Sequence, residues 1–285
     1  MKRTLGKIVK FKKAKLPSDK KLLGNYCWLE PLNIKKHSLS LYKNFLLDKK
    51  KEIWNYLPYG PFENYLSFKK WLNKDCLNQD PFFYAIYSKK NKEYCGMCSY
   101  LNIVPAHGTI EVGHINYSPI LQNTREGTEA MYLMMKNAFE ILKNRRYEWK
   151  CNNLNSASKK AALRLGFKFE GVFRQMFIFK GRSRDSAWFS IIDKEWLKNK
   201  KRFMNYLNTK NFDKNFKQKK KIMICIKTEI PNELNDIDDE LKAIYHSKDT
   251  VCFYIFKSRE LRNKFVDKTK GMNKDAREKI YNNYE

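Results

Sequence analysis

The sequence contains no apolar run that approaches the about 20 residues needed to cross a bilayer. Its first segment, from Met1 to Lys21, is basic but includes no apolar stretch of the signal-peptide type. We therefore expect no membrane span, and we interpret residues 1–24 as a basic, solvated tail rather than a transit peptide or a nucleic-acid-seeking arm. These features favour a cytoplasmic protein.

The usual nucleotide-binding fingerprints are also missing, because neither G-x-G-x-x-G nor G-x-x-x-x-G-K-S/T occurs. No metal site is expected either: Cys95-Gly96-Met97-Cys98 has metal-like spacing, but no second Cys/His pair follows at zinc-site spacing. The cysteines are odd in number and mostly stand in apolar, strand-like runs, which favours buried thiols in a reducing compartment over a disulfide framework. They are Cys27, Cys76, Cys95, Cys98, Cys151, Cys225 and Cys252.

Acidic residues are too few to balance the basic ones, and the formal net charge is +28. Such a charge predicts anionic partners, which could be nucleic acid, an acidic membrane surface or polyphosphate. A compositional bias toward Lys and Asn explains the same charge, and we favour it because no nucleic-acid recognition motif accompanies the basic residues. Both interpretations stay open at this point.

The chain has enough apolar residues for one substantial core and a smaller second one, with 42% hydrophobic and 15% aromatic residues in a length of 285. Runs of strand and helix patterns alternate, which predicts a mixed α/β fold. The expected organisation is a tail over 1–24, a main domain over 25–197, a basic helix and linker over 198–221, and a small α/β appendage over 222–285.

The individual elements follow from hydrophobic periodicity and turn residues. The predicted strands of the main domain are 25–30, 82–88, 93–104, 109–117, 147–152, 169–179 and 186–192. The predicted helices are 37–47, a single turn at 52–57, 62–77, a helix ending near 142, and 155–165. The last hairpin is expected to turn over Gly181 to Asp185. In the appendage, strands at 222–226 and 251–256 flank an acidic helix at 232–246, and helical segments follow to Tyr284.

The stretch from Gly108 to Gly171 organises the chain. A strand at 109–117 is followed by the polar turn Gln122-Asn123-Thr124-Arg125-Glu126-Gly127-Thr128, which opens a helix. The first turn of a helix has N–H groups without intrahelical acceptors and carries partial positive charge, so it can hold a phosphate or pyrophosphate. A second strand and a helix opened by Asn155 and closed by Gly166 come next.

These residues resemble the GNAT superfamily of acyl-CoA-dependent N-acetyltransferases. Gln122-x-x-Arg125-x-Gly127 is similar to its pyrophosphate loop, and Asn155-x-x-Ser158 followed by Leu165-Gly166-Phe167 is similar to its second cofactor segment. Glu111-x-Gly113 and Thr128-Glu129-Ala130 resemble most the branch that acetylates ribosomal-protein N-termini (RimJ/RimL-like). The resemblance covers about Asn25 to Trp196 and implies a splayed central sheet flanked by helices, with acetyl-CoA as co-substrate.

The resemblance also implies which residues bind the cofactor. Main-chain N–H groups of the polar turn would hold the pyrophosphate, Asn155 the pantetheine arm, and the strand after Glu111 would pair with that arm and meet the oxyanion. The predicted cofactor-binding residues are Val112, Gly113, His114, Gln122, Asn123, Thr124, Arg125, Glu126, Gly127, Thr128, Asn155 and Ser158.

Glu111 is the predicted general base and Ser158 the predicted hydrogen-bond donor or acid near the cofactor sulfur. The alternatives are a strand carboxylate that faces solvent or pairs with Lys, and an ordinary first-turn serine. His114 could serve as the base instead, although a lone strand histidine is more often structural. Two positions depart from the family pattern: Arg125 replaces a glycine of the loop, and Ala162 stands where many members carry a tyrosine acid.

The acceptor pocket is predicted from aromatic residues in the region that lies over the acceptor site in the family, although such spacing is also typical of a core. They are Trp54, Tyr56, Tyr59 and Phe62. The expected reaction is direct transfer of an acetyl group to a primary amine, either a protein N-terminus or a small molecule. The alternative is a catalytically silent acyl-CoA-fold module that associates with nucleic acid through its basic segments.

Overall fold

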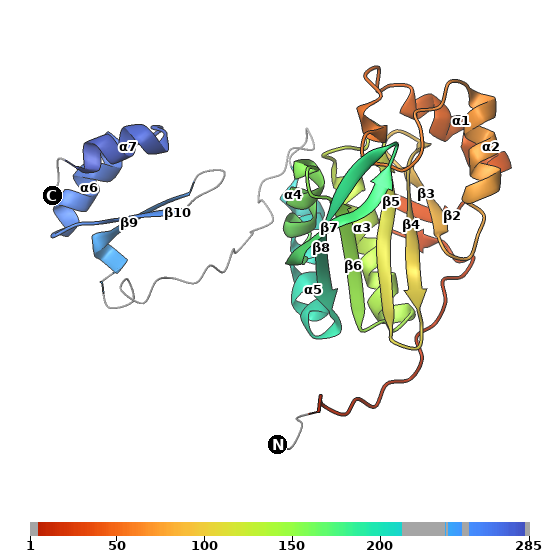
Figure 1. Cartoon of the computed structure of the whole chain (residues 1–285), viewed down its shortest axis with the longest axis horizontal. Helices are drawn as coiled ribbons and strands as arrows, with labels where there is room; N and C mark the ends of the chain where they lie inside the picture. Colours follow the sequence, from red (N-terminus) through yellow and green to blue (C-terminus); the bar gives the residue numbers. More distant parts are fainter. Residues whose placement is uncertain (1–4, 213–236, 238, 247–250, 283–285) are drawn as a thin grey trace. The chain divides into compact units, whose positions relative to one another are not determined.

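The computed structural model describes residues 5–212, 237, 239–246 and 251–282. The chain divides into two compact units, Met1–Ile224 and Cys225–Glu285, each of which is described by itself. The first unit holds a mixed sheet with helices on both faces, and the second holds a strand pair with two helices (Figure 1). This is the mixed α/β fold predicted from the sequence.

The sheet of the first unit has eight strands in the order β1-β2-β3-β4-β5-β6-β8-β7. Neighbouring strands are antiparallel except β5 and β6, which run parallel because a helix connects them. The strands are β1 (Leu22–Leu23), β2 (Cys27–Pro31), β3 (Phe82–Ser88), β4 (Glu93–Val104), β5 (Thr109–Tyr117), β6 (Arg146–Asn152), β7 (Lys168–Phe179) and β8 (Arg182–Ile192). Seven of these strands lie where the sequence predicts them, and β1 falls in the predicted tail.

The two faces of the sheet are covered by different helices. The helices are α1 (Ile34–Phe45), the 3-10 turn η1 (Glu52–Trp54), α2 (Tyr65–Asp75), α3 (Arg125–Lys136), its π-helical extension η2 (Asn137–Ile141), α4 (Ser156–Arg164), α5 (Asp193–Leu207) and the 3-10 turn η3 (Thr209–Asn211). One apolar cluster joins the sheet to α3 and α5, and a second cluster joins it to α1, η1 and α2. In β3, alternate residues therefore enter alternate cores, with Tyr84 and Ile86 on the α3 side and Phe83 and Ala85 on the α1–α2 side.

The sheet opens between its two parallel strands. β5 and β6 pair from Thr109↔Arg146 to Val112↔Trp149, while β5 continues beside β4 as far as Tyr117 and β6 continues beside β8 as far as Asn152. A bulge lies just beyond the last β5–β6 pair, where the β4–β5 register shifts and His114 has a φ of 49°. Past Val112 the two strands therefore diverge, which is the splay implied by the resemblance.

The β7–β8 hairpin bends over the sheet toward η1 (Figure 1). Two register shifts in β7, one of them between Phe173 and Phe177, produce the bend. At the tip, Lys180 Nζ donates a 2.8 Å hydrogen bond to the carbonyl of Trp54. The turn is shorter than the predicted Gly181–Asp185, because Lys180 and Gly181 both have positive φ and β8 already begins at Arg182. Two residues with positive φ are sufficient for a tight hairpin.

Part of the predicted tail lies against the first unit. The N–H of Ala14 donates to the carbonyl of Pro105, and the N–H of Lys15 donates to the carbonyl of Leu142. At the other end of the unit, α5 includes the first residues of the predicted basic linker, and Phe203, Leu207 and Phe212 belong to the apolar cluster on the α3 side.

The second unit contains β9 (Lys242–His246), β10 (Val251–Ile255), α6 (Arg259–Lys268) and α7 (Lys274–Tyr281), with a 3-10 turn η5 (Asp239–Leu241). The predicted helix over 232–246 is wrong at Lys242–His246, which pairs with β10 as a strand, while Asp239–Leu241 forms a 3-10 turn. Cross-strand pairing outweighs the local helix preference there. The strand predicted at 222–226 and the start of that helix lie outside the described residues, whereas the strand at 251–256 is confirmed.

Candidate active site

The polar turn after β5 leads into α3 at the mouth of the splay. Thr124 is the N-cap residue, and its Oγ1 accepts a 3.0 Å hydrogen bond from the N–H of Gly127 while donating to the carbonyl of Leu121. This cap fixes the direction in which the first turn of α3 presents its N–H groups. The geometry is that of an anion seat at a helix N-terminus.

Gly127 brings α3 close to the end of β5. A Cβ at this position would lie 2.7 Å from the carbonyl oxygen of Leu121 and 2.9 Å from the Tyr117 ring. The hydroxyl of Tyr117 donates a 2.8 Å hydrogen bond to the Gly127 carbonyl. A larger residue would therefore push the first turn of α3 away from the strand.

The Arg125 side chain packs on two aromatic rings. Its guanidinium lies 4.2 Å from the ring centre of Tyr26 and 5.4 Å from that of Phe212. The positive φ of the turn belongs to Asn123, at 57°, and Arg125 is the first helical residue of α3. The replacement of the family's glycine thus causes no strain here, and only the Arg125 main chain remains a predicted phosphate contact.

The other turn residues serve mainly local contacts. The Gln122 amide donates to the carbonyl of Tyr117 at 3.0 Å, and Thr128 Oγ1 donates to the carbonyl of Thr124 at 3.1 Å. Thr128 Oγ1 also accepts a 3.3 Å hydrogen bond from Arg164 of α4, so α3 and α4 are connected beside the splay. Glu126 is buried, with its carboxylate 3.5 Å from Arg125 Nε.

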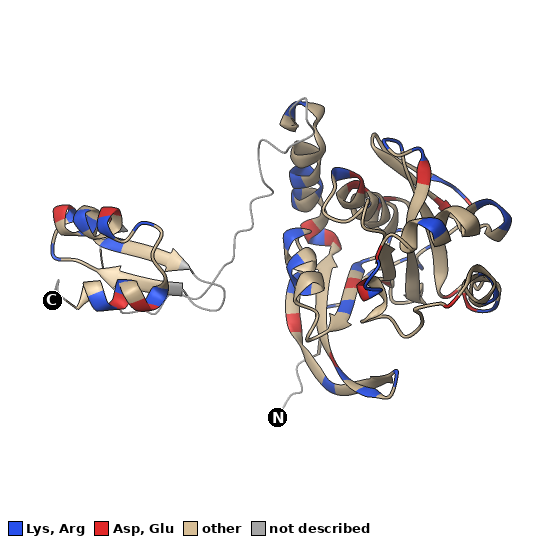
Figure 2. Ribbon diagram, turned by 90° about the horizontal axis from the view of Figure 1, so that it is seen from above, with Lys and Arg blue, Asp and Glu red and all other residues tan. Residues whose placement is uncertain are grey.

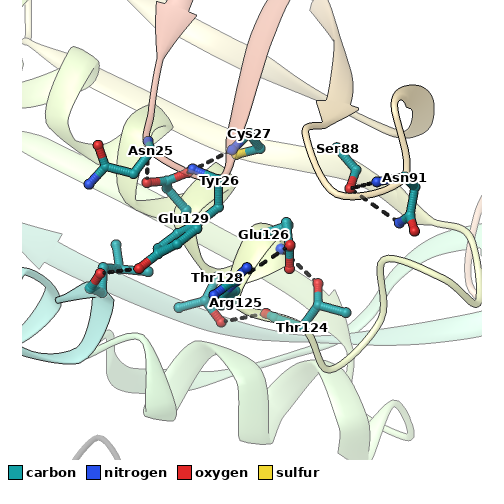
Figure 3. A network of polar contacts seen from close by, with 12 residues as sticks. Asn25, Tyr26, Cys27, Ser88, Asn91, Thr124, Arg125, Glu126, Thr128 and Glu129 are labelled. Atoms are coloured by element: carbon teal, nitrogen blue, oxygen red, sulfur yellow. Dashed lines mark hydrogen bonds and ion pairs between the residues drawn. The ribbon is translucent and has the colours of Figure 1, made fainter. Parts of the chain in front are cut away.

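Glu129 anchors α3 to the first strands. Its carboxylate accepts hydrogen bonds from the main-chain N–H groups of Asn25, Tyr26 and Cys27 at 2.7, 2.6 and 2.8 Å. Figure 3 shows this side chain pointing from α3 to the start of β2, with Thr124, Arg125 and Glu126 at the beginning of the helix. Three charge-assisted hydrogen bonds compensate the burial of the carboxylate. No local pattern indicates this contact, because the partners are more than a hundred residues away in the chain.

The second cofactor segment forms as predicted in its local structure. Asn155 caps α4 by accepting a 3.0 Å hydrogen bond from the N–H of Ser158, and Gly166, with a φ of 94°, ends the helix. Ser158 Oγ accepts a 3.0 Å hydrogen bond from Trp149 Nε1 on β6, the strand that borders the splay. Ala162 is fully buried in the α3-side core and offers no acid.

Glu111 lies on β5, one residue before the last β5–β6 pair, and its side chain is buried. Its carboxylate is 2.7 Å from Lys150 Nζ and accepts a 2.6 Å hydrogen bond from the Asn102 amide. Burial raises the pKa of Glu111, although Lys150 and Asn102 oppose the shift. The structure therefore places the predicted base in an ion pair on the face of the sheet away from α3.

Val112, Gly113 and His114 lie where the splay begins. Val112 enters the α3-side core, and Gly113 is the first β5 residue beyond the pairing with β6. The His114 ring stacks on Tyr59, with a 3.1 Å hydrogen bond between the Tyr59 hydroxyl and His114 Nδ1. Burial lowers the pKa of His114 to about 4, so this imidazole is neutral at pH 7 and a weaker base than Glu111.

The four predicted acceptor residues do not share one environment. Trp54 is buried in the α1–α2 cluster, Phe62 packs against that cluster, and both border a cavity of about 190 Å³ beside the end of α1. Tyr59 contacts His114 on β5, and Tyr56 is exposed, with its hydroxyl 3.4 Å from the carbonyl oxygen of Leu154. Of the four, Tyr59 thus contacts the strand that borders the splay.

The residues around the splay fit a coenzyme A arm and diphosphate. The diverging strands leave the main-chain groups of β5 beyond Val112 without a β6 partner, and an extended pantetheine chain can pair with such groups. The capped N-terminus of α3, held close by Gly127, supplies N–H donors and positive potential for the diphosphate.

Comparison with known families decides what this arrangement is. The acetyltransferase (GNAT) domain family matches residues 29–168. A GCN5-related N-acetyltransferase from Brucella melitensis is 38% identical, aligns with 75% of this chain and 96% of its own, and has a TM-score of 0.73. A probable GNAT-family acetyltransferase from Chromobacterium violaceum is also 38% identical, over 69% of this chain and 98% of its own, with a TM-score of 0.63. The chain belongs to the GNAT family. As a GNAT protein with these relatives, it is an acetyl-transferring enzyme.

The GNAT branch predicted from the sequence has weaker support. The ribosomal L7/L12 N-terminal acetyltransferase RimL is 18% identical over 61% of this chain and 94% of its own, with a TM-score of 0.51, which indicates a shared fold alone. No curated protein matches the sequence significantly.

Metal binding and membrane spanning can both be judged for the residues that the structure describes. Among them, no group of three or more His, Cys, Asp or Glu side chains could hold a metal ion. Nor does any helix within the described ranges have the length and apolar character needed to span a membrane. Cys95 and Cys98 are buried free thiols in β4, where burial raises the pKa of Cys95 to about 12.

Proposed function

We propose that this GNAT protein transfers the acetyl group of acetyl-CoA directly to a primary amine. The observation that carries the proposal is the splay between β5 and β6, which opens at Val112 and Trp149 beside the capped N-terminus of α3. Acetyl-CoA would use both features: its pantetheine arm would pair with the open strand edge, and its diphosphate would bind the helix N–H donors.

In this proposal, acetyl-CoA supplies the thioester carbonyl that is attacked. The main chain from Asn123 to Thr128 holds the diphosphate, and Asn155 and Ser158 contact the arm from α4. A main-chain N–H of the Val112–His114 segment stabilises the oxyanion.

The chain must also manage one proton. A lysine-like amine with a pKa of about 10.4 is neutral in about one molecule in 2,500 at pH 7, whereas an α-amine near 7.7 is neutral in about one in six. Attack of the neutral nitrogen forms the C–N bond and breaks the C–S bond, which yields the N-acetyl amine and the thiolate of coenzyme A. Glu111 accepts the proton lost by the nitrogen, directly or through water, and the thiolate takes up a proton from solvent.

The test is a thiol-release assay with acetyl-CoA against a panel of amines, with products identified by mass. The panel contains peptides with free α-amines, lysine, a polyamine and an aminoglycoside. We expect release that depends on an amine, a mass increase of one acetyl group, and binding of coenzyme A in calorimetry. A folded protein that gives no calorimetric signal with coenzyme A would refute the proposal.

Two other predictions from the sequence remain proposals. We place the enzyme in the cytoplasm, a proposal supported by the six described cysteines, which are all free thiols. Lys and Arg are distributed over helices, strands and loops of both units (Figure 2), so contact with nucleic acid rests on the net charge alone.

A further inference from the structure

Arg184 stands out among the cations on the face of the sheet that carries Glu111. On β8 it lies two residues from Ser186 and four from Trp188, so these three side chains share a face with Lys150, the cross-strand partner of Trp188. Glu111 approaches this group from β5 through its ion pair with Lys150. Arg184 is thus on the face of the sheet opposite to α3, which is also the face of the proposed base Glu111.

The fold holds the Arg184 guanidinium without neutralising it. Its Nε donates a 3.1 Å hydrogen bond to Ser186 Oγ, and the group lies 4.7 Å from the ring centre of Phe179 and 5.5 Å from that of Phe177. Among the described residues, no carboxylate forms an ion pair with it. Burial lowers the pKa of Arg184, although Cys151 and Glu111 oppose the shift, so its charge is partly desolvated and has no directly paired carboxylate among the described residues.

The neighbouring cations are used differently. Lys150 is 2.7 Å from Glu111 and 3.1 Å from Glu148, and Lys180 donates to the Trp54 carbonyl at the closed end of the hairpin. Of Lys150, Lys180 and Arg184, it is Arg184 that is half-buried and has terminal donors without an acceptor among the described residues. Its charge acts on both strands that border the splay. It lowers the pKa of His114 on β5, and on β6 it opposes the rise in the pKa of Cys151 that burial causes.

A half-buried guanidinium with open donors is a seat for a planar anion. Its fork matches a carboxylate in a bidentate arrangement, and such pairs are among the stronger polar contacts in proteins. A polycationic acceptor, such as a polyamine or an aminoglycoside, would instead meet like charge here.

We propose that the acceptor is an amine that carries a carboxylate and that Arg184 binds this carboxylate. This inference rests on the proposed amine acetylation and narrows its substrate class. The carboxylate can belong to a single amino acid derivative or to an acidic residue at a peptide N-terminus, and the test separates the two.

The probes are matched pairs that differ in one charge. The peptide pair is Asp-Ala-Ala amide and Asn-Ala-Ala amide, and the single-residue pair is aspartate α-amide and asparagine amide. For the wild-type protein we expect kcat/KM to be at least about 10-fold higher for the charged member of one pair, in line with a hydrogen bond to a charged group. The pair that shows the preference identifies the size of the acceptor.

Arg184→Gln should reduce the preference to about one, mainly by lowering kcat/KM for the charged member, and Arg184→Lys should retain part of it. Arg182→Gln is the matched control, because Arg182 lies on the same strand but is exposed. Calorimetry with the peptides in the presence of coenzyme A gives a readout independent of turnover, and the same preference is expected in Kd.

The outcomes separate this inference from the proposed function. Equal kcat/KM and equal Kd for both members of each pair, in a wild-type protein that acetylates amines, would overturn the carboxylate seat alone. An equal loss of preference in Arg182→Gln would also overturn it. Absence of transfer to every amine would refute the acetylation itself, and the inference with it. Should Arg184→Gln fail to fold, the wild-type ratios and Arg184→Lys still decide.

Discussion

Glu111 and Arg184 lie on one face of the sheet but differ in their partners and in their proposed functions. Glu111 is paired with Lys150 at 2.7 Å and is nearly inaccessible to solvent, whereas Arg184 has no carboxylate partner among the described residues. A paired carboxylate stays ionised and is able to accept a proton, but the ammonium weakens it as a base. Burial acts in the opposite direction and raises the pKa of Glu111 overall.

The substitution Glu111→Gln removes the proposed general base and keeps the size of the side chain. We expect kcat/KM with a lysine-like amine to fall about 100-fold near pH 7, because removal of a general base costs about that factor. The deficit should shrink at alkaline pH, where the amine loses its proton unaided, and the Kd for coenzyme A should stay within about 2-fold. A pH–rate profile and calorimetry measure both quantities.

Lys150→Met is the matched control for that variant. It removes the same ion pair but keeps the carboxylate, so a loss specific to Glu111→Gln isolates proton transfer from structural support. With Lys150 absent, the Glu111 pKa should rise further, and the acidic limb of the pH–rate profile should move to higher pH. A Glu111→Gln profile with unchanged shape would exclude Glu111 as the base.

At this scale the sequence could predict residues whose function is set by near neighbours. Thr124 and Asn155 each cap a helix by accepting from the N–H three residues ahead, and Gly166 ends a helix, so all three depend on short local motifs. The sequence could not predict the Lys150–Glu111 pair or the exposed donors of Arg184. Both depend on strand register across the sheet, and Arg184 was expected in a turn.

At the scale of elements, β5 matters more for its irregularity than for its strand character. The alternation of its residues predicts the strand from Thr109 to Tyr117 correctly. The bulge at His114 and the divergence from β6 after Val112 are set by pairing with two different neighbours, so a local pattern contains no signal for them. The splay was accordingly expected from the resemblance and not from the periodicity.

Glu129 supplies the element-scale prediction, because it connects α3 to the start of β2. Glu129→Gln leaves one oxygen acceptor and turns an NH₂ group toward main-chain N–H donors of Asn25, Tyr26 and Cys27. We expect a loss of about 2–4 kcal/mol in the free energy of unfolding, since hydrogen bonds to a charged acceptor are lost and donors are left buried. Urea denaturation followed by fluorescence measures the change.

Glu126→Gln is the control, on the same helix and equally buried. Its Oε1 lies 3.5 Å from Arg125 Nε but accepts no hydrogen bond, so neutralising it should cost less than about 1 kcal/mol. Equal losses for the two variants would mean that burial, rather than the three main-chain contacts, determines the importance of Glu129.

In the whole molecule, the first unit extends beyond α5 and does not end at residue 197, which lies inside that helix. The sequence predicts a basic helix and linker over 198–221, outside the main domain, because basic residues dominate there. Yet Phe203, Leu207 and Phe212 are buried in the core of the first unit, and the Tyr26 hydroxyl donates a 2.9 Å hydrogen bond to the Leu207 carbonyl. The second unit has its own apolar cluster around Phe265.

Truncation after residue 212, beyond α5, and truncation after residue 197, within α5, should therefore have different results. A chain of residues 1–212 keeps the complete core and every candidate site residue, so its Tm and its kcat/KM for small amines should match those of the first unit in the full chain. A chain of residues 1–197 loses three large buried side chains, each worth about 1.5–3 kcal/mol, out of a total stability of about 5–15 kcal/mol. We expect its Tm to fall by at least about 10 °C, since each kcal/mol shifts a domain of this size by about 2–4 °C. Scanning calorimetry and the thiol-release assay measure both chains. If 1–197 were as stable and active as 1–212, α5 would not be part of the catalytic unit, and the core described here would be wrong at that edge.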